Sequence, residues 1–196
     1  MINFAGMTKA ELRKQFIKKR NALTSAELEN LSESILEHLQ SLTVFEDAEY
    51  VHMFHPISGK QEINTLRIAE WLRKDHPQIK LLLPKSNFED HTLEHIVWDS
   101  DNILIINKWG ISEPEAGHSI PAEKIDIVLV PLLAVDFAGH RIGYGKGFYD
   151  RFLAKCRPNV VKIGLSFFEP IEHIEDVNTY DIPLNKCVTP KQVWHF

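Results

Sequence analysis

Runs of branched apolar residues, each bounded by turn residues, recur along this chain. The clearest run covers residues 125–130 and is interrupted only by Asp126 before the break at Pro131. Such a run is typical of a strand that is buried on both faces of a sheet. The same pattern predicts strands at residues 50–55, 79–84 and 160–167, and a last short strand near the C-terminus.

Helix signals lie between these runs. Capping boxes begin at Thr8 and at Thr24, each with a glutamate three residues later, and they predict two helix starts. Apolar side chains follow at helical spacing: Leu12, Phe16 and Ile17 in the first helix, and Leu28, Leu31, Ile35 and Leu39 in the second. Asn64 is placed to cap a third helix that runs through Leu72. A fourth, amphipathic helix ends at Leu153.

The alternation of strands and helices predicts the fold class. Strands that alternate with helical segments favour a three-layer α/β/α architecture with a largely parallel sheet. The chain has 196 residues, 44% of them hydrophobic, and it contains no internal repeat. We therefore expect residues 1–196 to form a single domain with ample core.

Alternating glycines follow the strongest predicted strand. Gly143, Gly145 and Gly147 leave the backbone N–H groups free of Cβ interference, so a ligand can approach closely. Amides of this kind, followed by a helix, form an anion-binding site. Arg141 and Lys146 add a planar guanidinium and a mobile ammonium. Loops after parallel strands are also where α/β proteins bind ligands.

Three side chains beside the glycines extend this chemistry. Asp150 follows the loop, where a carboxylate could hold Mg²⁺ beside phosphates. Phe148 and Tyr149 offer ring faces to a flat substrate. We therefore predict a nucleotide phosphate chain lying next to an aromatic substrate.

Standard nucleotide and nucleophile motifs do not fit the loop. Its spacing is G-x-G-x-G rather than G-x-G-x-x-G, and Gly147 stands where a Walker A motif requires Ser or Thr. No G-x-S-x-G or cysteine–histidine motif indicates a covalent nucleophile. The alternative interpretation is a flexible surface loop with solvated charges, although clustered glycines and charges on loops favour function.

Composition narrows the class of protein. The formal charge of −5 argues against a general nucleic-acid binder, which is usually basic. Cys156 and Cys187 have no metal-binding or redox spacing, so we expect inert core thiols in a reduced compartment. The N-terminal residues lack the apolar core of a signal peptide, and no apolar run is long enough to span a bilayer. We expect a soluble, cytoplasmic monomer without nucleic-acid or membrane partners.

Several isolated candidates admit two interpretations. Lys9 and Arg13 share one helix face, which by spacing alone favours a solvated basic surface. Glu62 follows a strand and could accept hydrogen bonds from a heterocycle, with His55 nearby, or it could be an ordinary exposed glutamate. Asp181 precedes a proline, as turn aspartates do.

Two further segments contain side chains that could bind a metal or contact a substrate. His91 and His95 are four residues apart, but Thr92 replaces the glutamate of H-E-x-x-H, so an ordinary polar role is favoured over metal binding. Trp109 lies in a glycine turn, where it either anchors the loop half-buried or contacts substrate at a rim.

The central stretch as a whole resembles a known family. The segment VPLLAVDFAGHRIGYGKGFYDRFL is similar to the signature of 5-formyltetrahydrofolate cyclo-ligase, also called methenyltetrahydrofolate synthetase, which typically reads close to PGLAFD-x-x-G-x-RLGYGGGYYDR-x-L. Weaker family segments occur in the same order along nearly the whole chain: K-x-x-x-R, E-I-x-T, L-P-K, G-I-x-E-P and D-x-P-L.

The resemblance implies a reaction and assigns roles to residues. The family uses ATP and Mg²⁺ to cyclise 5-formyltetrahydrofolate to 5,10-methenyltetrahydrofolate, and it shares the predicted fold. On this basis the catalytic pair is Arg141 and Lys146. The implied ATP-binding residues are Lys9, Arg13, Arg141, Gly143, Tyr144, Gly145, Lys146, Gly147, Phe148 and Tyr149.

The resemblance also implies a metal site and a folate site. Asp150 and Asp181 would hold Mg²⁺. The implied folate-binding residues are His55, Glu62, Trp109, Tyr144 and Phe148, the last of which replaces the family's usual tyrosine. Two alternatives stay open: another ATP-dependent ligase or phosphotransferase acting on a small carbonyl substrate, and a non-catalytic module that binds nucleotide or folate.

Overall fold

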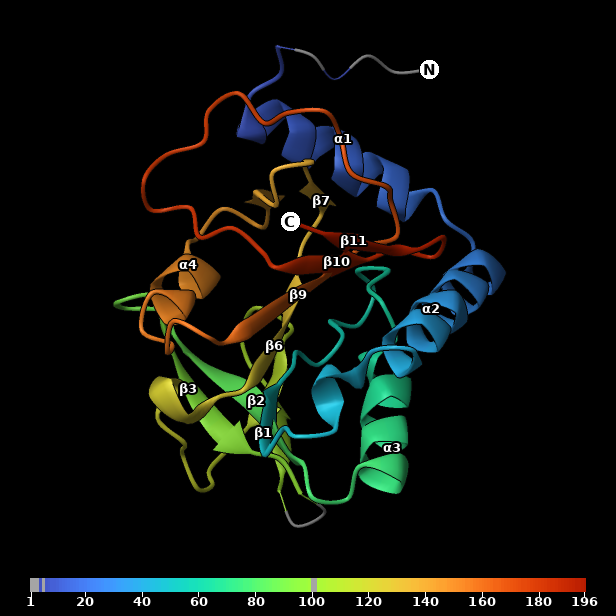
Figure 1. The fold of residues 1–196 in the computed structure, drawn as a ribbon. Helices are drawn as coiled ribbons and strands as arrows, with labels where there is room; N and C mark the ends of the chain where they lie inside the picture. Colours follow the sequence, from blue (N-terminus) through green and yellow to red (C-terminus); the bar gives the residue numbers. More distant parts are fainter. Residues whose placement is uncertain (1–3, 5, 100–101) are drawn as a thin grey trace.

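A seven-stranded sheet runs through the centre of the molecule (Figure 1). The computed structural model describes residues 4, 6–99 and 102–196. In sheet order the strands are β11 (Val193–His195), β10 (Lys186–Val188), β9 (Val161–Leu165), β6 (Ile127–Pro131), β1 (Tyr50–His52), β2 (Lys80–Asn87) and β3 (Thr92–Val97). The inner pairings, from β10 to β2, are parallel, and only the two edge strands run antiparallel to their neighbours.

Helices cover both faces of this sheet and one of its ends (Figure 1). They are α1 (Lys9–Asn21), α2 (Ser25–Gln40), α3 (Thr65–Asp75) and α4 (Phe148–Leu153), with 3-10 turns η1 (Thr43–Phe45) and η2 (Ala122–Lys124). Two small hairpins complete the described part: β4 (Leu104–Ile106) with β5 (Ser112–Pro114), and β7 (Ala134–Val135) with β8 (Arg141–Ile142). The predicted α/β fold with a largely parallel sheet is confirmed.

The central strand β6 shows why its sequence is apolar throughout. Ile127 and Leu129 pack with α2 and α3 in one core cluster, whereas Val128 and Val130 pack against α4 in another. Alternate side chains of a strand point to opposite faces, so a strand covered on both sides needs apolar residues at every position.

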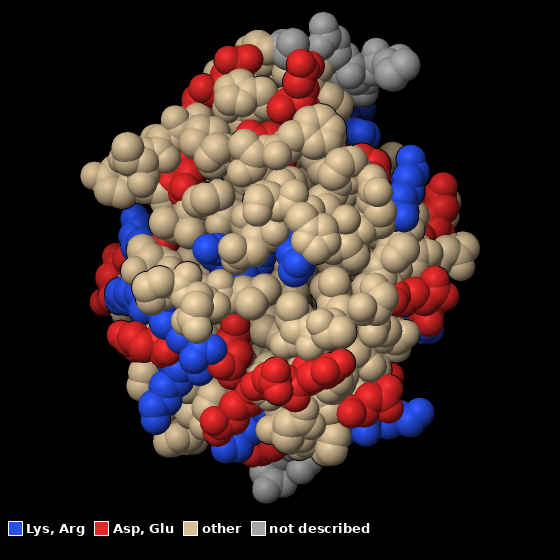
Figure 2. Space-filling view, in the orientation of Figure 1, with Lys and Arg blue, Asp and Glu red and all other residues tan. Residues whose placement is uncertain are grey.

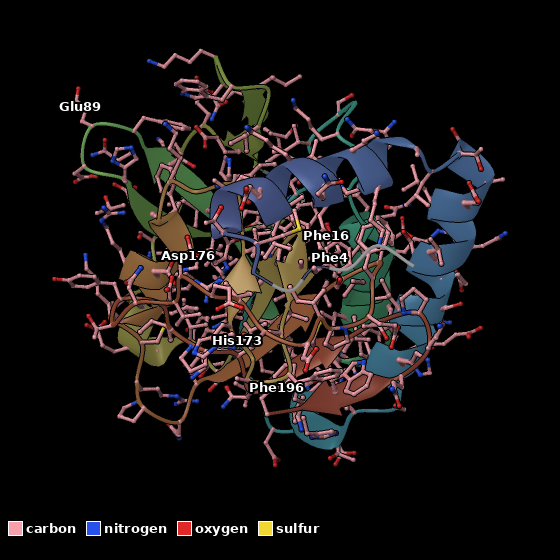
Figure 3. The ribbon with its side chains drawn as sticks, turned by 90° about the horizontal axis from the view of Figure 1, so that it is seen from above. Phe4, Phe16, Glu89, His173, Asp176 and Phe196 are labelled. Carbon is pink, nitrogen blue, oxygen red and sulfur yellow. The ribbon has the colours of Figure 1, made fainter. Side chains whose placement is uncertain are left out.

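Helix α1 lies over the β7–β8 hairpin rather than on the main sheet. Its Leu12 and Phe16 are buried with Ile142 in a third apolar cluster. Phe4 and Phe16 lie side by side, with ring centroids 5.1 Å apart (Figure 3). The capping box at Thr8 is formed as predicted, and Asp176 also accepts a hydrogen bond from the Lys9 amide at 2.7 Å. These contacts fix the start of α1 beside the middle of the long loop between β9 and β10.

Strand β1 is shorter than the predicted strand at residues 50–55. It ends at His52, and Met53 still donates to the Leu82 carbonyl. The next carbonyl, that of Phe54, instead accepts the Thr65 hydroxyl at 2.6 Å. Because this bond replaces a ladder bond, the chain leaves the sheet there. Asn64 occupies the N-cap position of α3, but its side chain makes no capping bond, which corrects the expected cap.

Strand β2 is longer than predicted, because its outer edge is paired. The prediction ended at Pro84, but β2 continues through Lys85 to Asn87, opposite β3. Strand β3 was not predicted: most of the HTLEH segment belongs to it, with His91 in the preceding turn at φ 58°. The search for apolar runs did not detect β3, because one end of this strand is polar.

Both thiols are placed in the core, as expected. Cys187 is buried and Cys156 is partly buried, and both belong to or pack on the cluster beneath α4. Burial raises the pKa of Cys156 to about 12 and also raises the pKa of Cys187. Since the thiolate is the reactive form, neither thiol is activated.

The surface charge of the protein is mixed in sign. Acidic and basic side chains are interspersed around the face drawn in Figure 2, with no continuous basic field on that face. None of the described helices combines the length and apolarity that crossing a bilayer requires.

Two histidines lie in contact between the sheet and α4. His52 and His95 meet edge to face with ring centroids 5.1 Å apart, and both contact Phe152. Within the described residues, both ring nitrogens of His52 and Nδ1 of His95 lack hydrogen-bond partners. Burial, with His95 adding repulsion, lowers the pKa of His52 well below its ordinary value. Burial, with Lys155 adding repulsion, lowers the pKa of His95 to about 4.

We expect this pair to make the fold sensitive to acid. The unfolded chain protonates His95 near pH 6.5, but the folded protein does so only near pH 4. The unfolded state therefore binds more protons between these values. The contribution to stability is complete above pH 6.5 and is lost as the pH falls toward 4, by about 3 kcal/mol.

Urea unfolding of wild type and His95→Phe at pH 7.0 and 4.5 measures this effect. The variant should lose less unfolding free energy on acidification than wild type. The control is His118→Gln, at an exposed position, which should behave like wild type. Equal pH dependence in wild type and His95→Phe would contradict the assignment.

Candidate functional site

A single cleft of about 1250 Å³ opens at the carboxyl ends of the parallel strands. Pro131 at the end of β6 and Phe54 just beyond β1 form part of its floor. All the residues assigned from the sequence line it: Lys9, Arg13, His55, Glu62, Trp109, Arg141, Gly143, Tyr144, Gly145, Lys146, Gly147, Phe148, Tyr149, Asp150 and Asp181. The structure thus brings together side chains that are up to 172 residues apart in the sequence.

The glycine loop connects β8 to α4, and α1 holds it from one side. Gly145 and Gly147 have φ angles of +87° and +71°, which favour glycine. A Cβ at Gly145 would also lie 3.0 Å from the Arg13 guanidinium carbon. Arg13 in turn donates from Nε to the Gly143 carbonyl at 2.8 Å. The close approach of arginine and backbone explains why the loop needs a residue without a side chain at this point.

Arg141 is buried at the base of the loop. It donates to the Ile182 carbonyl and, at 2.6 Å, to Oδ1 of Asp150. Burial lowers the pKa of Arg141, and Asp150 beside it opposes the shift. A guanidinium remains protonated under these conditions, so Arg141 presents a fixed positive charge from a side chain that is 5% exposed.

A second charge pair closes the same end of the cleft. Lys9 forms an ion pair with Asp181, and the backbone N–H of Asn178 donates to the same carboxylate oxygen at 2.6 Å. Burial raises the pKa of Asp181, but the hydrogen bonds from Lys9 and Asn178 outweigh this and lower the pKa overall. Asp181 is therefore an ionised carboxylate at neutral pH.

The two aspartates fit a magnesium ion that is shared with phosphate. They are neighbours, because Oδ1 of Asp150 also accepts the Ile182 amide at 3.2 Å. Among residues 4, 6–99 and 102–196, no group of three or more His, Cys, Asp or Glu side chains could hold a metal by itself. Mg²⁺ is usually held by one or two carboxylates together with substrate phosphates and waters, and Asp150 with Asp181 match that incomplete protein set.

Glu62 lines the same cleft as these charges. Its Oε2 accepts the Ile57 amide at 2.9 Å, and its Oε1 accepts the Tyr144 hydroxyl at 2.5 Å. Burial, with the Glu62 charge adding to it, raises the pKa of Tyr144, so its hydroxyl remains a donor. The carboxylate is thus held from two sides, with further acceptor positions left for a ligand.

Aromatic rings form one wall of the cleft. Phe88 stacks on Trp109 at 5.2 Å and meets Phe148 edge to face at 5.4 Å. Trp109 is 53% exposed, which favours the rim interpretation over that of a half-buried anchor. Tyr149 differs from these rings, because its hydroxyl is buried without a hydrogen-bond partner in the described part of the chain, and burial raises its pKa.

Two residues at or behind the cleft were not assigned from the sequence: Phe88, which lines the cleft, and Arg20, which contacts Glu62 and Tyr144 from α1. Phe88 lies in the turn between β2 and β3, a hairpin that was not predicted. Arg20 lies seven residues after Arg13, so it occupies the same face of α1 two turns further on. That spacing was a usable signal, but a cluster of neighbouring lysines and arginines hid it.

Comparisons with known proteins agree on one family. A model of the 5-formyltetrahydrofolate cyclo-ligase family matches residues 5–190. The 5-formyltetrahydrofolate cyclo-ligase of Haemophilus influenzae is 26% identical over 179 residues, which cover 89% of this chain and 93% of that protein.

Two solved structures are similar over nearly the whole chain. The NMR structure of Aquifex aeolicus 5,10-methenyltetrahydrofolate synthetase has a TM-score of 0.81 at 33% identity, and covers 96% of this chain and 93% of its own. The 5,10-methenyltetrahydrofolate synthetase of Mycoplasma pneumoniae has a TM-score of 0.75 at 26% identity, with 94% and 99% covered.

Proposed function

This chain belongs to the 5-formyltetrahydrofolate cyclo-ligase family, and from that premise we propose that it uses ATP to cyclise 5-formyltetrahydrofolate to 5,10-methenyltetrahydrofolate, releasing ADP and phosphate. One observation carries the proposal. The glycine loop with its cations and the carboxylate of Glu62 line the same cleft, so a triphosphate and a heterocycle can lie side by side.

The chemistry explains why two substrates must meet. The oxygen of a formyl group that is attached to an amide-like nitrogen is a poor leaving group. Transfer of the γ-phosphoryl group to this oxygen breaks the terminal P–O bond of ATP, releases ADP and gives an iminium phosphate. The neighbouring folate amine then attacks the formyl carbon and loses its N–H proton to solvent, the C–O bond breaks, and phosphate leaves with the electron pair. Such steps depend on positioning and charge neutralisation more than on a covalent protein group.

The phosphate side of the cleft supplies that neutralisation. The backbone amides of the loop from Gly143 to Gly147 and the cations of Lys9, Arg13 and Arg141 would bind phosphate oxygens. Asp150 and Asp181 would hold Mg²⁺, which when bound draws negative charge from the phosphates. Because these carboxylates are already paired with Arg141 and Lys9, the protein keeps the charges of this region balanced.

The other side of the cleft would hold the folate. The Glu62 carboxylate can accept paired N–H groups from a pterin ring, an arrangement that fixes the orientation of a planar heterocycle. The rings of Trp109, Phe148 and Tyr144 would supply apolar contact, and His55 lines the same cleft. The formyl group would then point toward Lys146.

The methenyl chromophore tests this function directly. We expect purified protein to form it only when ATP, Mg²⁺ and 5-formyltetrahydrofolate are all present, with one ADP released per product. Equal ATP hydrolysis with unformylated tetrahydrofolate would favour a different phosphotransferase. Folate binding without ADP release would favour a non-catalytic module.

A further inference from the structure

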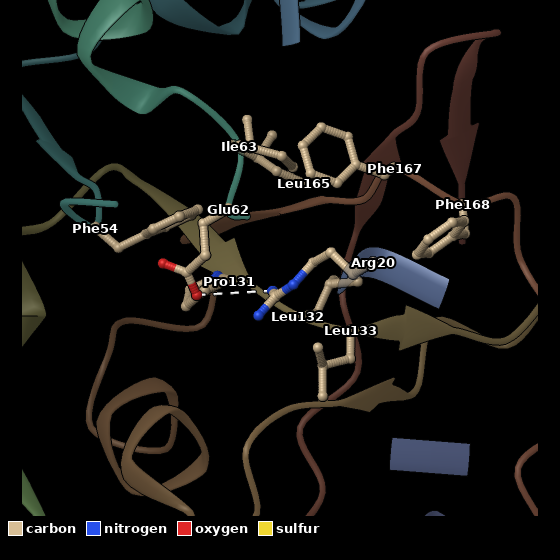
Figure 4. A pocket seen from close by; sticks show the side chains of 10 residues that line it. All are labelled: Arg20, Phe54, Glu62, Ile63, Pro131, Leu132, Leu133, Leu165, Phe167 and Phe168. Atoms are coloured by element: carbon tan, nitrogen blue, oxygen red, sulfur yellow. Dashed lines mark ion pairs between the residues drawn. The ribbon is translucent and has the colours of Figure 1, made fainter. Parts of the chain in front are cut away.

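Arg20 points toward Glu62, with which it forms an ion pair (Figure 4). Arg20 is the second-to-last residue of α1, which ends at Asn21, and it is 6% exposed. One terminal nitrogen lies 3.7 Å from Oε1 of Glu62, and the other donates to the Tyr144 hydroxyl. The guanidinium also lies over the Tyr144 ring, 5.5 Å from its centroid. A single arginine therefore contacts two of the residues assigned to the folate.

The Arg20–Glu62 part of this network is buried, whereas Tyr144 is 42% exposed. The Arg20 and Glu62 side chains are 7% and 5% exposed. A pocket of only about 10 Å³ adjoins them, and its other lining residues are apolar: Phe54, Ile63, Pro131, Leu132, Leu133, Leu165, Phe167 and Phe168. Charge interactions are stronger in such surroundings than in water. A buried carboxylate without its cation would also carry a large desolvation cost.

We propose that Arg20 is a positioning residue for the folate-binding carboxylate, an inference that rests on the proposed function. It fixes Oε1 of Glu62 both directly and through the Tyr144 hydroxyl, while the Ile57 amide fixes Oε2. The carboxylate plane is thereby set before folate arrives. Since Tyr144 belongs to the glycine loop, the same arginine ties the folate site to the phosphate site.

A purely structural ion pair would have a different kinetic signature. Loss of a stabilising pair would reduce the folded fraction and leave the KM of the remaining folded enzyme unchanged for both substrates. Loss of a positioning residue raises the KM for the substrate that the carboxylate binds. The two KM values therefore separate the possibilities.

Steady-state kinetics of Arg20→Gln supply this test. We expect the KM for 5-formyltetrahydrofolate to rise roughly 10- to 100-fold, the cost of a disturbed hydrogen bond to a charged group, with the KM for ATP within about twofold. Arg20→Lys keeps the charge but loses the planar fork, so it should recover only part of the loss. Lys18→Gln, at an exposed position of the same helix, is the matched control and should resemble wild type.

A double-mutant cycle with Glu62→Gln asks whether Arg20 acts through that carboxylate. If it does, adding Arg20→Gln to Glu62→Gln should change the folate KM by less than about threefold, because the interaction is already broken. Additive effects of the two changes would overturn the inference, as would a folate KM that stays at the wild-type value in Arg20→Gln.

Other outcomes are also decisive. Should Arg20→Gln fail to fold, an unchanged folate KM in Arg20→Lys overturns the inference. Should wild type form no methenyl product, the proposed function fails. The same variants are then compared by binding of 5-formyltetrahydrofolate, followed by tryptophan fluorescence, and equal affinity in wild type and Arg20→Gln overturns the role of Arg20 by itself.

Discussion

Replacing Lys146 with alanine is expected to lower kcat for methenyl formation by about 100- to 1000-fold, with the KM for 5-formyltetrahydrofolate nearly unchanged. Four cations are assigned to the phosphates, and three of them are already held. Lys9 and Arg141 are paired with aspartates, and Arg13 is bonded to the Gly143 carbonyl. In the part of the chain that the structure describes, the ammonium of Lys146 has no such partner and is exposed in the cleft. It is free to follow charge that develops on the transferring phosphoryl group.

The measurement is steady-state turnover with ATP and folate varied separately. Lys146→Arg should keep more activity than Lys146→Ala, because it retains a cation at the same place but changes its geometry. Lys124→Ala, at an exposed position in η2, removes a lysine elsewhere and should leave turnover unchanged. If Lys146→Ala raised the KM for ATP and left kcat intact, Lys146 would be a ground-state binding residue instead.

The glycine-loop side of the cleft could be predicted because its residues are local in sequence. One continuous segment contains the apolar run of β6, the spaced glycines and Asp150. The residue types in this segment indicate a ligand-binding loop without reference to the rest of the chain. The opposite side is assembled from distant segments. Glu62 and Lys9 were assigned through the family resemblance, because neither spacing nor composition brings them to the glycine loop.

The parts that could not be predicted depend on tertiary contacts. The end of β1 is set by the Thr65 hydroxyl, which takes the carbonyl of Phe54, and no strand pattern records that choice. The continuation of β2 is set by its partner β3, whose own sequence is only weakly apolar. Arg20 illustrates the same limit. The sequence predicts that a basic residue on a basic helix is solvated, and only the fold shows its contacts with Glu62 and Tyr144.

Changing Glu62 to glutamine is expected to raise the KM for 5-formyltetrahydrofolate by roughly 10- to 100-fold, with the KM for ATP nearly unchanged. The carboxylate is surrounded by donors: the Ile57 amide on one oxygen, and Arg20 with the Tyr144 hydroxyl on the other. A glutamine amide has one acceptor oxygen and one NH₂ donor, so its NH₂ must face a donor on one side. It also removes the charge that balances Arg20, and a broken buried pair costs about 3 kcal/mol or more of unfolding free energy.

Two readings on the same variant separate these effects. Urea unfolding should show the loss of unfolding free energy. Steady-state kinetics, measured under conditions in which the variant is folded, should show the rise in the KM for 5-formyltetrahydrofolate. Glu37→Gln, at an exposed position of α2, is the matched control and should change neither. A Glu62→Gln variant that is destabilised but binds 5-formyltetrahydrofolate normally would assign the carboxylate to the core alone. Normal binding would remove it from the folate site, because a donor placed where an acceptor is required cannot satisfy the N–H groups of a pterin ring.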